Sequence, residues 1–256
     1  MTVLKLTQIT DLHLGPTADS TCRNLKTYKT LQSVLSAIDC DGRAQDRLLI
    51  TGDIASHAQP EAYQLIDHLL VSQNRRAMWL PGNHDRIDLM QKNLKNFPFT
   101  PVFEAGNWAV IMLDSSVPDQ PIGLIADAEM QRLEQYLASL SDKNILVAMH
   151  HSSVEIGSHW VDQHRIANYQ QLSTLLASHG KVKALINGHV HQQHSAYLGD
   201  IPVYATPSTC FQFKPNIGQF ALDNQPPAYR WFELHSDGSI ETGVKFLPWS
   251  HDNPQC

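Results

Sequence analysis

The sequence has no apolar run long enough to cross a bilayer, because a spanning helix needs about 20 apolar residues. Its start also lacks a basic segment followed by a long apolar stretch, so we expect no secretory signal. Basic residues are few: 19 Lys and Arg against 25 Asp and Glu give a formal net charge of −6, without a basic stripe. We therefore expect a cytoplasmic protein that binds neither membranes nor nucleic acids.

Cysteine is also scarce, with four residues that form no CxxC pair, which argues against a thiolate zinc site. Histidine is abundant, at 14 residues, but it occurs on ordinary surfaces as well as in metal sites. A hydrophobic content of 42% over 256 residues suffices for one large α/β domain. We expect that domain to span residues 1–247 and the polar residues 248–256 to form a loose tail.

Short apolar runs alternate with segments of helical periodicity along most of the chain. Strands are predicted at residues 3–10, 47–51, 77–80, 109–114, 145–149 and 182–186. Helices are predicted at residues 28–38, 62–69, 130–140 and 172–176. Near the C-terminus, Gly199-Asp200 and Asp237-Gly238 are turn pairs between strands at 195–198, 201–205, 229–234 and 239–246. This order predicts an α/β fold in which sheets lie between helices.

Potential metal ligands lie directly after five of the predicted strands. They lie in DLH at 11–13, GD at 52–53, GNHD at 82–85, HH at 150–151 and GHVH at 188–191. Ligands of open α/β sheets gather outside the carboxyl ends of the strands, so these side chains are expected to converge. Carboxylates, imidazoles and an amide oxygen suit iron, manganese or zinc.

The local spacing within these motifs supports a shared site. Asp11 and His13 are one residue apart, which in extended chain places both on one side. Asp53 has two carboxylate oxygens and is the natural bridge between two ions. Each motif alone has an ordinary interpretation, since Gly-Asp is a common turn and Asp-x-His a common strand end. The five motifs in this order are what indicates a metal centre.

The ordered set DLH, GD, GNHD, HH and GHVH resembles the calcineurin-like metallophosphoesterase superfamily over about residues 3–246. The stretches QITDLHL, WLPGNHD, WVDQH, ATPSTCFQF, PPAYRW and DGSIET are similar to its bacterial 3′,5′-cyclic AMP phosphodiesterases. The resemblance implies a four-layer α/β/β/α sandwich of mixed sheets with helices on the outer faces. It also implies two divalent ions per subunit, Fe²⁺ and/or Mn²⁺, with Zn²⁺ as a third candidate, in a monomer or homodimer.

The resemblance assigns a role to each motif residue. The first metal would be held by Asp11, His13, Asp53 and His191, and the second by Asp53, Asn83, His150 and His189. Substrate would lie near His13, Asp53, Asn83, His84 and His191. The expected catalytic residues are His84, Asp53 and Asp85, with His84 hydrogen-bonded to Asp85. Family members often have proline soon after the paired histidines, whereas Ser152-Ser153 follow here; this changes the loop and bears on substrate selectivity.

The implied activity is hydrolysis of 3′,5′-cyclic AMP, or another cyclic nucleotide, to the 5′-nucleotide by a metal-activated hydroxide. The alternatives are 2′,3′-cyclic nucleotides, phosphomonoesters or nucleotide diphosphate derivatives, and a catalytically silent interaction module of the same fold. Candidates for an aromatic face against the base are Phe211, Phe213, Tyr229 and Trp231, with packing inside the C-terminal hairpins as the favoured interpretation. Two further histidines, His159 and His164, are candidates for lining the pocket.

Overall fold

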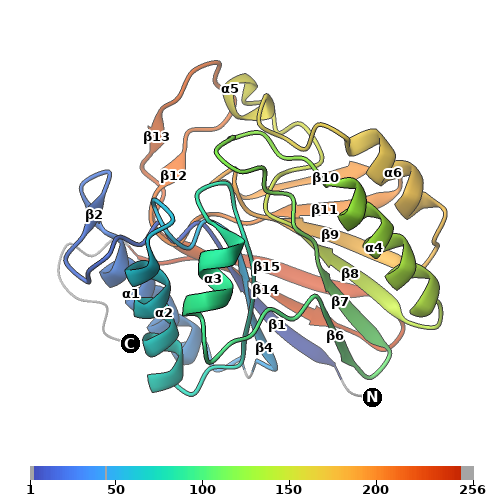
Figure 1. The fold of residues 1–256 in the computed structure, drawn as a ribbon, viewed down its shortest axis with the longest axis horizontal. Helices are drawn as coiled ribbons and strands as arrows, with labels where there is room; N and C mark the ends of the chain where they lie inside the picture. Colours follow the sequence, from blue (N-terminus) through green and yellow to red (C-terminus); the bar gives the residue numbers. More distant parts are fainter. Residues whose placement is uncertain (1–2, 44, 249–256) are drawn as a thin grey trace.

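Two mixed β-sheets lie face to face in the computed structural model, which describes residues 3–43 and 45–248 (Figure 1). The first sheet has the order β15-β14-β1-β4-β5, with β1 at Leu4–Ile9, β4 at Arg47–Thr51, β5 at Ala77–Leu80, β14 at Ala228–Leu234 and β15 at Ile240–Phe246. The second has the order β10-β11-β9-β8-β7-β6, with β6 at Val102–Ala105, β7 at Trp108–Met112, β8 at Asn144–Ala148, β9 at Val182–Asn187, β10 at His194–Leu198 and β11 at Ile201–Ala205. The tail predicted at 248–256 lies outside the described residues except for Pro248.

Alternation along the strands divides the apolar side chains between two faces of each sheet. On β8, Leu146 and Ala148 face the first sheet, whereas Ile145 and Val147 face outward. The inner residues of β7 and β9 join those of β8 and of the first sheet in one core between the two sheets. Near-continuous apolar strands of this kind are expected where a sheet is buried on both faces.

Helices cover the outer face of each sheet (Figure 1). The first sheet is covered by α1 at Thr27–Cys40, α2 at Pro60–Ser72 and α3 at Ile87–Asn93; the second is covered by α4 at Asp127–Ser139 and α6 at Tyr169–Ala177. Leu31, Leu35 and Ile38 follow the helical period and are buried, and each contributes about 1.5–3 kcal/mol. The predicted four-layer sandwich with outer helices is therefore confirmed.

Strand direction brings the carboxyl ends of the central strands to one edge of the sandwich. Strands β1, β4 and β5 are parallel to one another, as are β7, β8 and β9. The two predicted C-terminal hairpins are present but extend different sheets: β14–β15 pairs antiparallel with β1, and β10–β11 joins the second sheet beside β9. The loops after β1, β4, β5, β8 and β9 consequently meet.

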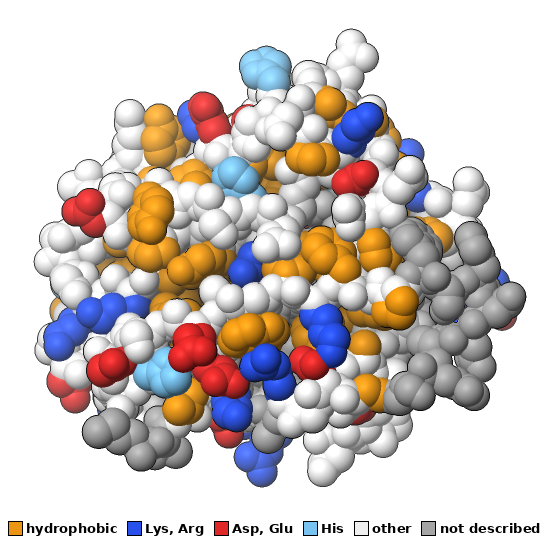
Figure 2. Space-filling view, turned by 180° about the vertical axis from the view of Figure 1, so that it is seen from behind, with side chains coloured by type: hydrophobic (Ala, Val, Ile, Leu, Met, Phe, Trp, Pro, Cys, Tyr) orange, Lys and Arg blue, Asp and Glu red, His pale blue; other side chains and the backbone are white. Residues whose placement is uncertain are grey.

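Two small two-stranded sheets stand beyond this edge. They are formed by β2 at Thr21–Cys22 with β3 at Leu25–Lys26, and by β12 at Gln212–Phe213 with β13 at Leu222–Asp223. Figure 1 shows β12 and β13 near the short helix α5 at His159–Asp162, and β2 farther to the left. On the opposite view of the molecule, Lys and Arg side chains are intermingled with Asp and Glu side chains (Figure 2). In the described ranges, no helix has the length and apolar character that a membrane span requires.

Candidate metal centre

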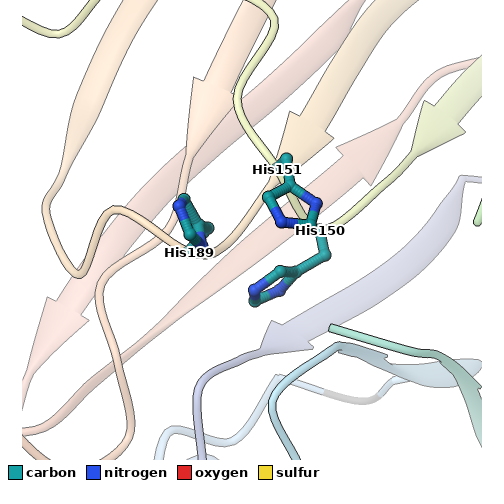
Figure 3. Close-up of side chains that lie close together, drawn as sticks. All are labelled: His150, His151 and His189. Carbon is teal, nitrogen blue, oxygen red and sulfur yellow. The ribbon is translucent and has the colours of Figure 1, made fainter. Parts of the chain in front are cut away.

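The strand-end loops bring all seven predicted ligands into two adjoining groups. Asp11 and His13 follow β1, Asp53 follows β4 and Asn83 follows β5. His150 follows β8, and His189 and His191 follow β9. In Figure 3 the rings of His150 and His189 face a common space from two neighbouring strands of the second sheet. Six of these side chains are buried and Asn83 is half-buried, so polar groups are concentrated where apolar packing would be expected.

The backbone at this edge is in an unusual conformation. Positive φ angles occur at five of the seven predicted ligands, with values of 53° at Asp11, 47° at His13, 50° at Asp53, 67° at His189 and 48° at His191. The left-handed region costs energy for residues with a Cβ and persists where a site requires it. The explanation of Asp11 and His13 by extended chain is therefore wrong; paired left-handed turns bring their side chains together.

The first group consists of Asp11, His13 and His191, with Asp53 beside it. Nε2 of His191 lies 3.2 Å from Nε2 of His13 and 3.2 Å from Oδ1 of Asp11. The other oxygen of Asp11, Oδ2, accepts hydrogen bonds from the Thr10 hydroxyl and the His189 amide, whereas the buried Oδ1 accepts none. One carboxylate oxygen is thus held in place and the other is free for a cation.

The second group consists of Asn83, His150 and His189, again with Asp53 beside it. Oδ1 of Asn83 lies 3.2 Å from Nε2 of His150 and 3.0 Å from Nδ1 of His189. Oδ1 of Asp53 lies 3.4 Å from Nε2 of His150, and Oδ2 of Asp53 lies 3.8 Å from Nε2 of His13. The two oxygens of Asp53 therefore face different groups, as a bridging carboxylate requires.

Backbone carbonyls fix which nitrogen of two imidazoles carries the proton. Nδ1 of His150 donates to the Thr51 carbonyl at 2.8 Å, and Nδ1 of His191 donates to the Phe211 carbonyl at 2.7 Å. A carbonyl oxygen only accepts, so in the neutral rings each Nε2 carries a lone pair. Metal-binding histidines in proteins are oriented in this way. In the neutral rings, the Nε2 lone pair of His191 in the first group and that of His150 in the second group are therefore free to bind divalent cations.

Charge interactions within the groups are strong because water is excluded. Burial lowers the pKa of His13 to about 3, despite the nearby Asp53 carboxylate. Burial also acts to lower the pKa of His150, but Asp53 and Asp11 outweigh it and raise that pKa to about 9. Burial would raise the pKa of Asp53, yet His150, His84 and His13 together hold it well below its ordinary value. A divalent ion bound here would replace the proton of His150.

His84 lies at the rim of the two groups, with its side chain 40% exposed. Its Nδ1 donates to the Ser56 carbonyl at 2.8 Å, and its Nε2 lies 4.0 Å from Oδ2 of Asp53. The predicted hydrogen bond from His84 to Asp85 is wrong. The Asp85 carboxylate instead accepts hydrogen bonds from the Ile54, Ala55 and Gly82 amides and the Tyr63 hydroxyl, which occupy both of its oxygens.

His151 is a third buried imidazole at the second group, beside His150 and His189. Its ring centroid lies 4.6 Å from that of His189 and 5.0 Å from that of His150 (Figure 3). Nδ1 of His151 lies 2.9 Å from the Ser115 hydroxyl, and burial lowers the pKa of His151 to about 3. Ser152, the first of the two serines that follow the paired histidines, is buried and donates to the Val154 carbonyl at 2.8 Å.

A cavity of about 480 Å³ opens over both groups and is lined by residues that the motifs did not reveal. Phe211, Phe213 and His164 line it, as expected for pocket candidates. Tyr229 is instead buried against α1, Trp231 lies 4.0 Å from the Arg43 guanidinium, and His159 contacts Gln163, so none of the three lines this cavity. The lining residues that were not predicted include Arg23, Trp160 and Phe220.

Gly188→Ala is expected to weaken metal binding about 10- to 100-fold, the usual effect of a change that displaces a group hydrogen-bonded to a metal ligand. A Cβ at Gly188 would overlap the Thr10 hydroxyl and approach Oδ2 of Asp11 to 2.7 Å, so the Asp11 carboxylate must move. Calorimetric titration with Mn²⁺ measures the effect. Gly180→Ala is the matched control, because a Cβ there meets nothing within 4 Å. Equal affinities in the two variants would contradict the proposed position of Asp11.

Comparison with known proteins agrees with this geometry. The family model described as calcineurin-like phosphoesterase matches residues 4–193. The chain is 35% identical to the 3′,5′-cyclic adenosine monophosphate phosphodiesterase CpdA of Escherichia coli (strain K12), with 95% of this chain and 90% of the relative covered. It is 31% identical to a 3′,5′-cyclic-nucleotide phosphodiesterase of Nostoc sp., with 96% and 94% covered.

Solved structures share the fold at lower identity. A dimetal phosphatase from Danio rerio superposes with a TM-score of 0.62 at 14% identity, covering 90% of this chain and 95% of its own. The protein TT1561 of Thermus thermophilus superposes with a TM-score of 0.59 at 17% identity, covering 94% and 99%. The family match spans most of the chain and includes every motif that forms the two ligand groups. The chain belongs to the calcineurin-like phosphoesterase family.

Proposed function

We propose that the chain hydrolyses 3′,5′-cyclic AMP to 5′-AMP at a dinuclear metal centre. The observation that carries the proposal is the orientation of Asp53, whose two carboxylate oxygens face separate ligand groups. The relatives named for cyclic nucleotide hydrolysis cover nearly the whole chain, which supports this substrate over other phosphoesters. Such an activity would lower a cyclic nucleotide signal.

The residues assigned to the metals are those of the two groups. One ion would be held by Asp11, His13, Asp53 and His191, and the other by Asp53, Asn83, His150 and His189. The mixed oxygen and imidazole donors suit Fe²⁺ and/or Mn²⁺, with Zn²⁺ as a third candidate. When bound, such a pair supplies Lewis-acid stabilisation of the phosphoryl oxygens and a water of lowered pKa.

His84 is the proposed proton donor to the leaving 3′ oxygen. Its Nδ1 is fixed on the Ser56 carbonyl, so a proton on Nε2 is the one available for transfer towards the cavity. With substrate phosphate near His13, Asp53, Asn83 and His191, the partly exposed His84 side chain, which lines the same cavity, would be within reach of the leaving oxygen. General acid catalysis of this kind contributes about 10²–10⁴-fold.

Asp85 acts as a positioning residue in this proposal. Its carboxylate ties the Ile54 and Ala55 amides of the loop after β4 to the Gly82 amide of the loop after β5. Those loops carry Asp53, Asn83 and His84, so Asp85 sets their spacing without contacting substrate. Burial and the nearby Asp53 carboxylate raise the pKa of Asp85 to about 6, and the hydrogen bonds from the Gly82, Ala55 and Ile54 amides counteract that rise.

The alternatives are phosphoesterases for 2′,3′-cyclic nucleotides, phosphomonoesters or nucleotide diphosphate derivatives, since a two-metal centre recognises phosphate rather than the rest of the molecule. A silent interaction module is disfavoured by the complete ligand set. A cytoplasmic location and a monomeric or homodimeric state stay predictions.

Metal removal and refilling tests the proposal. Protein stripped with a chelator is expected to lose activity on cyclic AMP, and Mn²⁺ or Fe²⁺ is expected to restore it. The values of kcat/KM are then compared for cyclic AMP, cyclic GMP, 2′,3′-cyclic AMP and p-nitrophenyl phosphate. We expect the highest value for cyclic AMP. A higher kcat/KM for 2′,3′-cyclic AMP or p-nitrophenyl phosphate would contradict the proposed substrate and assign the activity to that substrate class instead.

A further inference from the structure

Three aromatic side chains form a cluster at the mouth of the cavity over the metal centre. Trp160 of α5, Phe213 of β12 and Phe220 of the loop between β12 and β13, called here the aromatic cluster, pack edge to face. Their ring centroids lie 4.9 Å apart for Trp160–Phe213, 5.2 Å for Trp160–Phe220 and 5.5 Å for Phe213–Phe220. In Figure 1, α5 lies near the hairpin of β12 and β13, although the two segments are far apart in sequence. Their rings thus build one apolar cluster.

The aromatic cluster is continuous with the first metal group. The Phe213 ring stacks on the His191 ring with a centroid distance of 4.0 Å and an interplanar angle of 20°. Nε2 of the same His191 ring lies 3.2 Å from Oδ1 of Asp11. A phosphate at the metal centre would therefore have an aromatic surface one side chain away, beyond the His191 ring.

The aromatic cluster is only partly covered by the protein. Phe220 is 42% exposed, although exposure of a large aromatic ring to water is unfavourable. Nε1 of Trp160 is buried and has no hydrogen-bond partner in the described part of the chain. The Phe220 ring thus keeps apolar surface in contact with water, and the Trp160 N–H has no acceptor among the described residues.

A positive charge lies beside the aromatic cluster. The Arg23 guanidinium, in the turn between β2 and β3, lies 4.8 Å from the centroid of the Phe220 ring. Arg23 is exposed and makes no ion pair with any acidic side chain in residues 3–43 and 45–248. It is thus available to contact a ligand that enters the cavity.

We infer that the aromatic cluster and Arg23 bind the purine base of the substrate. Nucleic-acid bases stack on aromatic rings, and an arginine at the edge of the stack adds cation–π contact and donors for ring nitrogens. The cavity is lined both by metal-centre residues and by these four residues, and its volume of about 480 Å³ lies in the range of small-molecule pockets. The inference rests on the proposed hydrolysis of a cyclic nucleotide and adds how the base is recognised.

The test compares substrates with and without a base in the metal-loaded, full-length protein. Phe220→Ala is expected to raise the KM for cyclic AMP about 5- to 150-fold, the loss expected for one stacked base. We expect kcat, metal content and activity on the abasic 1-deoxyribose 3′,5′-cyclic phosphate to stay at the wild-type level. An equal loss on both substrates, or a loss on neither, would overturn the inference.

Leu222→Ala is the matched control, because Leu222 is also 42% exposed and lies in β13 of the same hairpin but does not line the cavity. This variant is expected to behave as wild type on both substrates. A rise in KM for cyclic AMP in Leu222→Ala as large as that in Phe220→Ala would assign the effect to the hairpin as a whole and overturn the inference.

Product binding separates this inference from the proposed activity. Calorimetry compares 5′-AMP with ribose 5-phosphate in wild type, Phe220→Ala and Trp160→Leu. We expect both variants to weaken 5′-AMP binding and to leave ribose 5-phosphate binding unchanged, whether or not wild type hydrolyses cyclic AMP. Wild type that binds 5′-AMP through the cluster but does not hydrolyse cyclic AMP would refute the proposed function alone. Equal weakening of both ligands, or of neither, would refute the aromatic cluster as the base site.

Discussion

Asp53→Asn is expected to lower kcat on cyclic AMP by about 10³-fold or more and to remove at least one bound metal ion. Metal contacts to the phosphoryl group are worth several kcal/mol in the transition state, and each 1.36 kcal/mol is tenfold in rate. An amide has one oxygen and one NH₂ group, so it cannot offer an acceptor to both ligand groups that Asp53 now faces. Steady-state kinetics and elemental metal analysis on the same preparation measure both effects.

A control for this prediction removes a carboxylate elsewhere. Asp142→Asn changes an exposed loop residue after α4 and is expected to leave activity and metal content unchanged. If Asp53→Asn retained wild-type turnover and two ions per chain, Asp53 would not bridge the metals. Loss of folding in Asp53→Asn is detectable by circular dichroism, and a folded variant with one ion is the expected result.

His84→Ala is expected to lower kcat on cyclic AMP by about 10²–10⁴-fold while metal content stays near two ions per chain. Nε2 of His84 is exposed to the cavity, its Nδ1 is bound to the Ser56 carbonyl, and it stands 4.0 Å from the nearest carboxylate oxygen of Asp53. The His84 ring is thus placed to transfer a proton rather than to bind the metal ions. Loss of both metals in this variant would instead make His84 a ligand.

The leaving group distinguishes proton transfer from phosphate binding by His84. A nitrophenolate leaves without protonation, so bis(p-nitrophenyl) phosphate is expected to lose much less activity in His84→Ala than cyclic AMP does. His68→Ala, which removes an exposed imidazole on α2, serves as the control and is expected to match wild type on both substrates. Equal losses on the two substrates in His84→Ala would indicate that His84 only binds the phosphate.

Much of the fold was predictable because the pattern of apolar residues in the sequence agrees with the residues that the structure buries. The predicted strands at 47–51, 77–80 and 201–205 coincide with β4, β5 and β11. The predicted helices fall on α1, α2, α4 and α6, and the one at 130–140 ends one residue beyond α4. Elements such as α3 and β6 were not predicted, since they are short and only partly apolar. Their positions depend on packing against neighbours that are distant in sequence.

The ligand groups were predictable for a different reason. Each ligand follows a strand directly, so the sheet topology alone brings the motifs to one edge. The left-handed backbone at Asp11 and His13 and the partners of Asp85 could not be derived, because they depend on contacts between loops after different strands. Phe220 lacked any motif, and its contact with Trp160 joins segments 60 residues apart.

Electron paramagnetic resonance of protein loaded with Mn²⁺ tests the dinuclear centre most directly. We expect metal-free protein to take up two equivalents of Mn²⁺, and the second equivalent to convert an isolated Mn²⁺ signal into an exchange-coupled spectrum. The proposed bridge through Asp53, whose two oxygens face different ligand groups, would be the structural basis of that coupling. Uptake of a single ion, or of two ions that give only independent signals, would contradict the dinuclear centre.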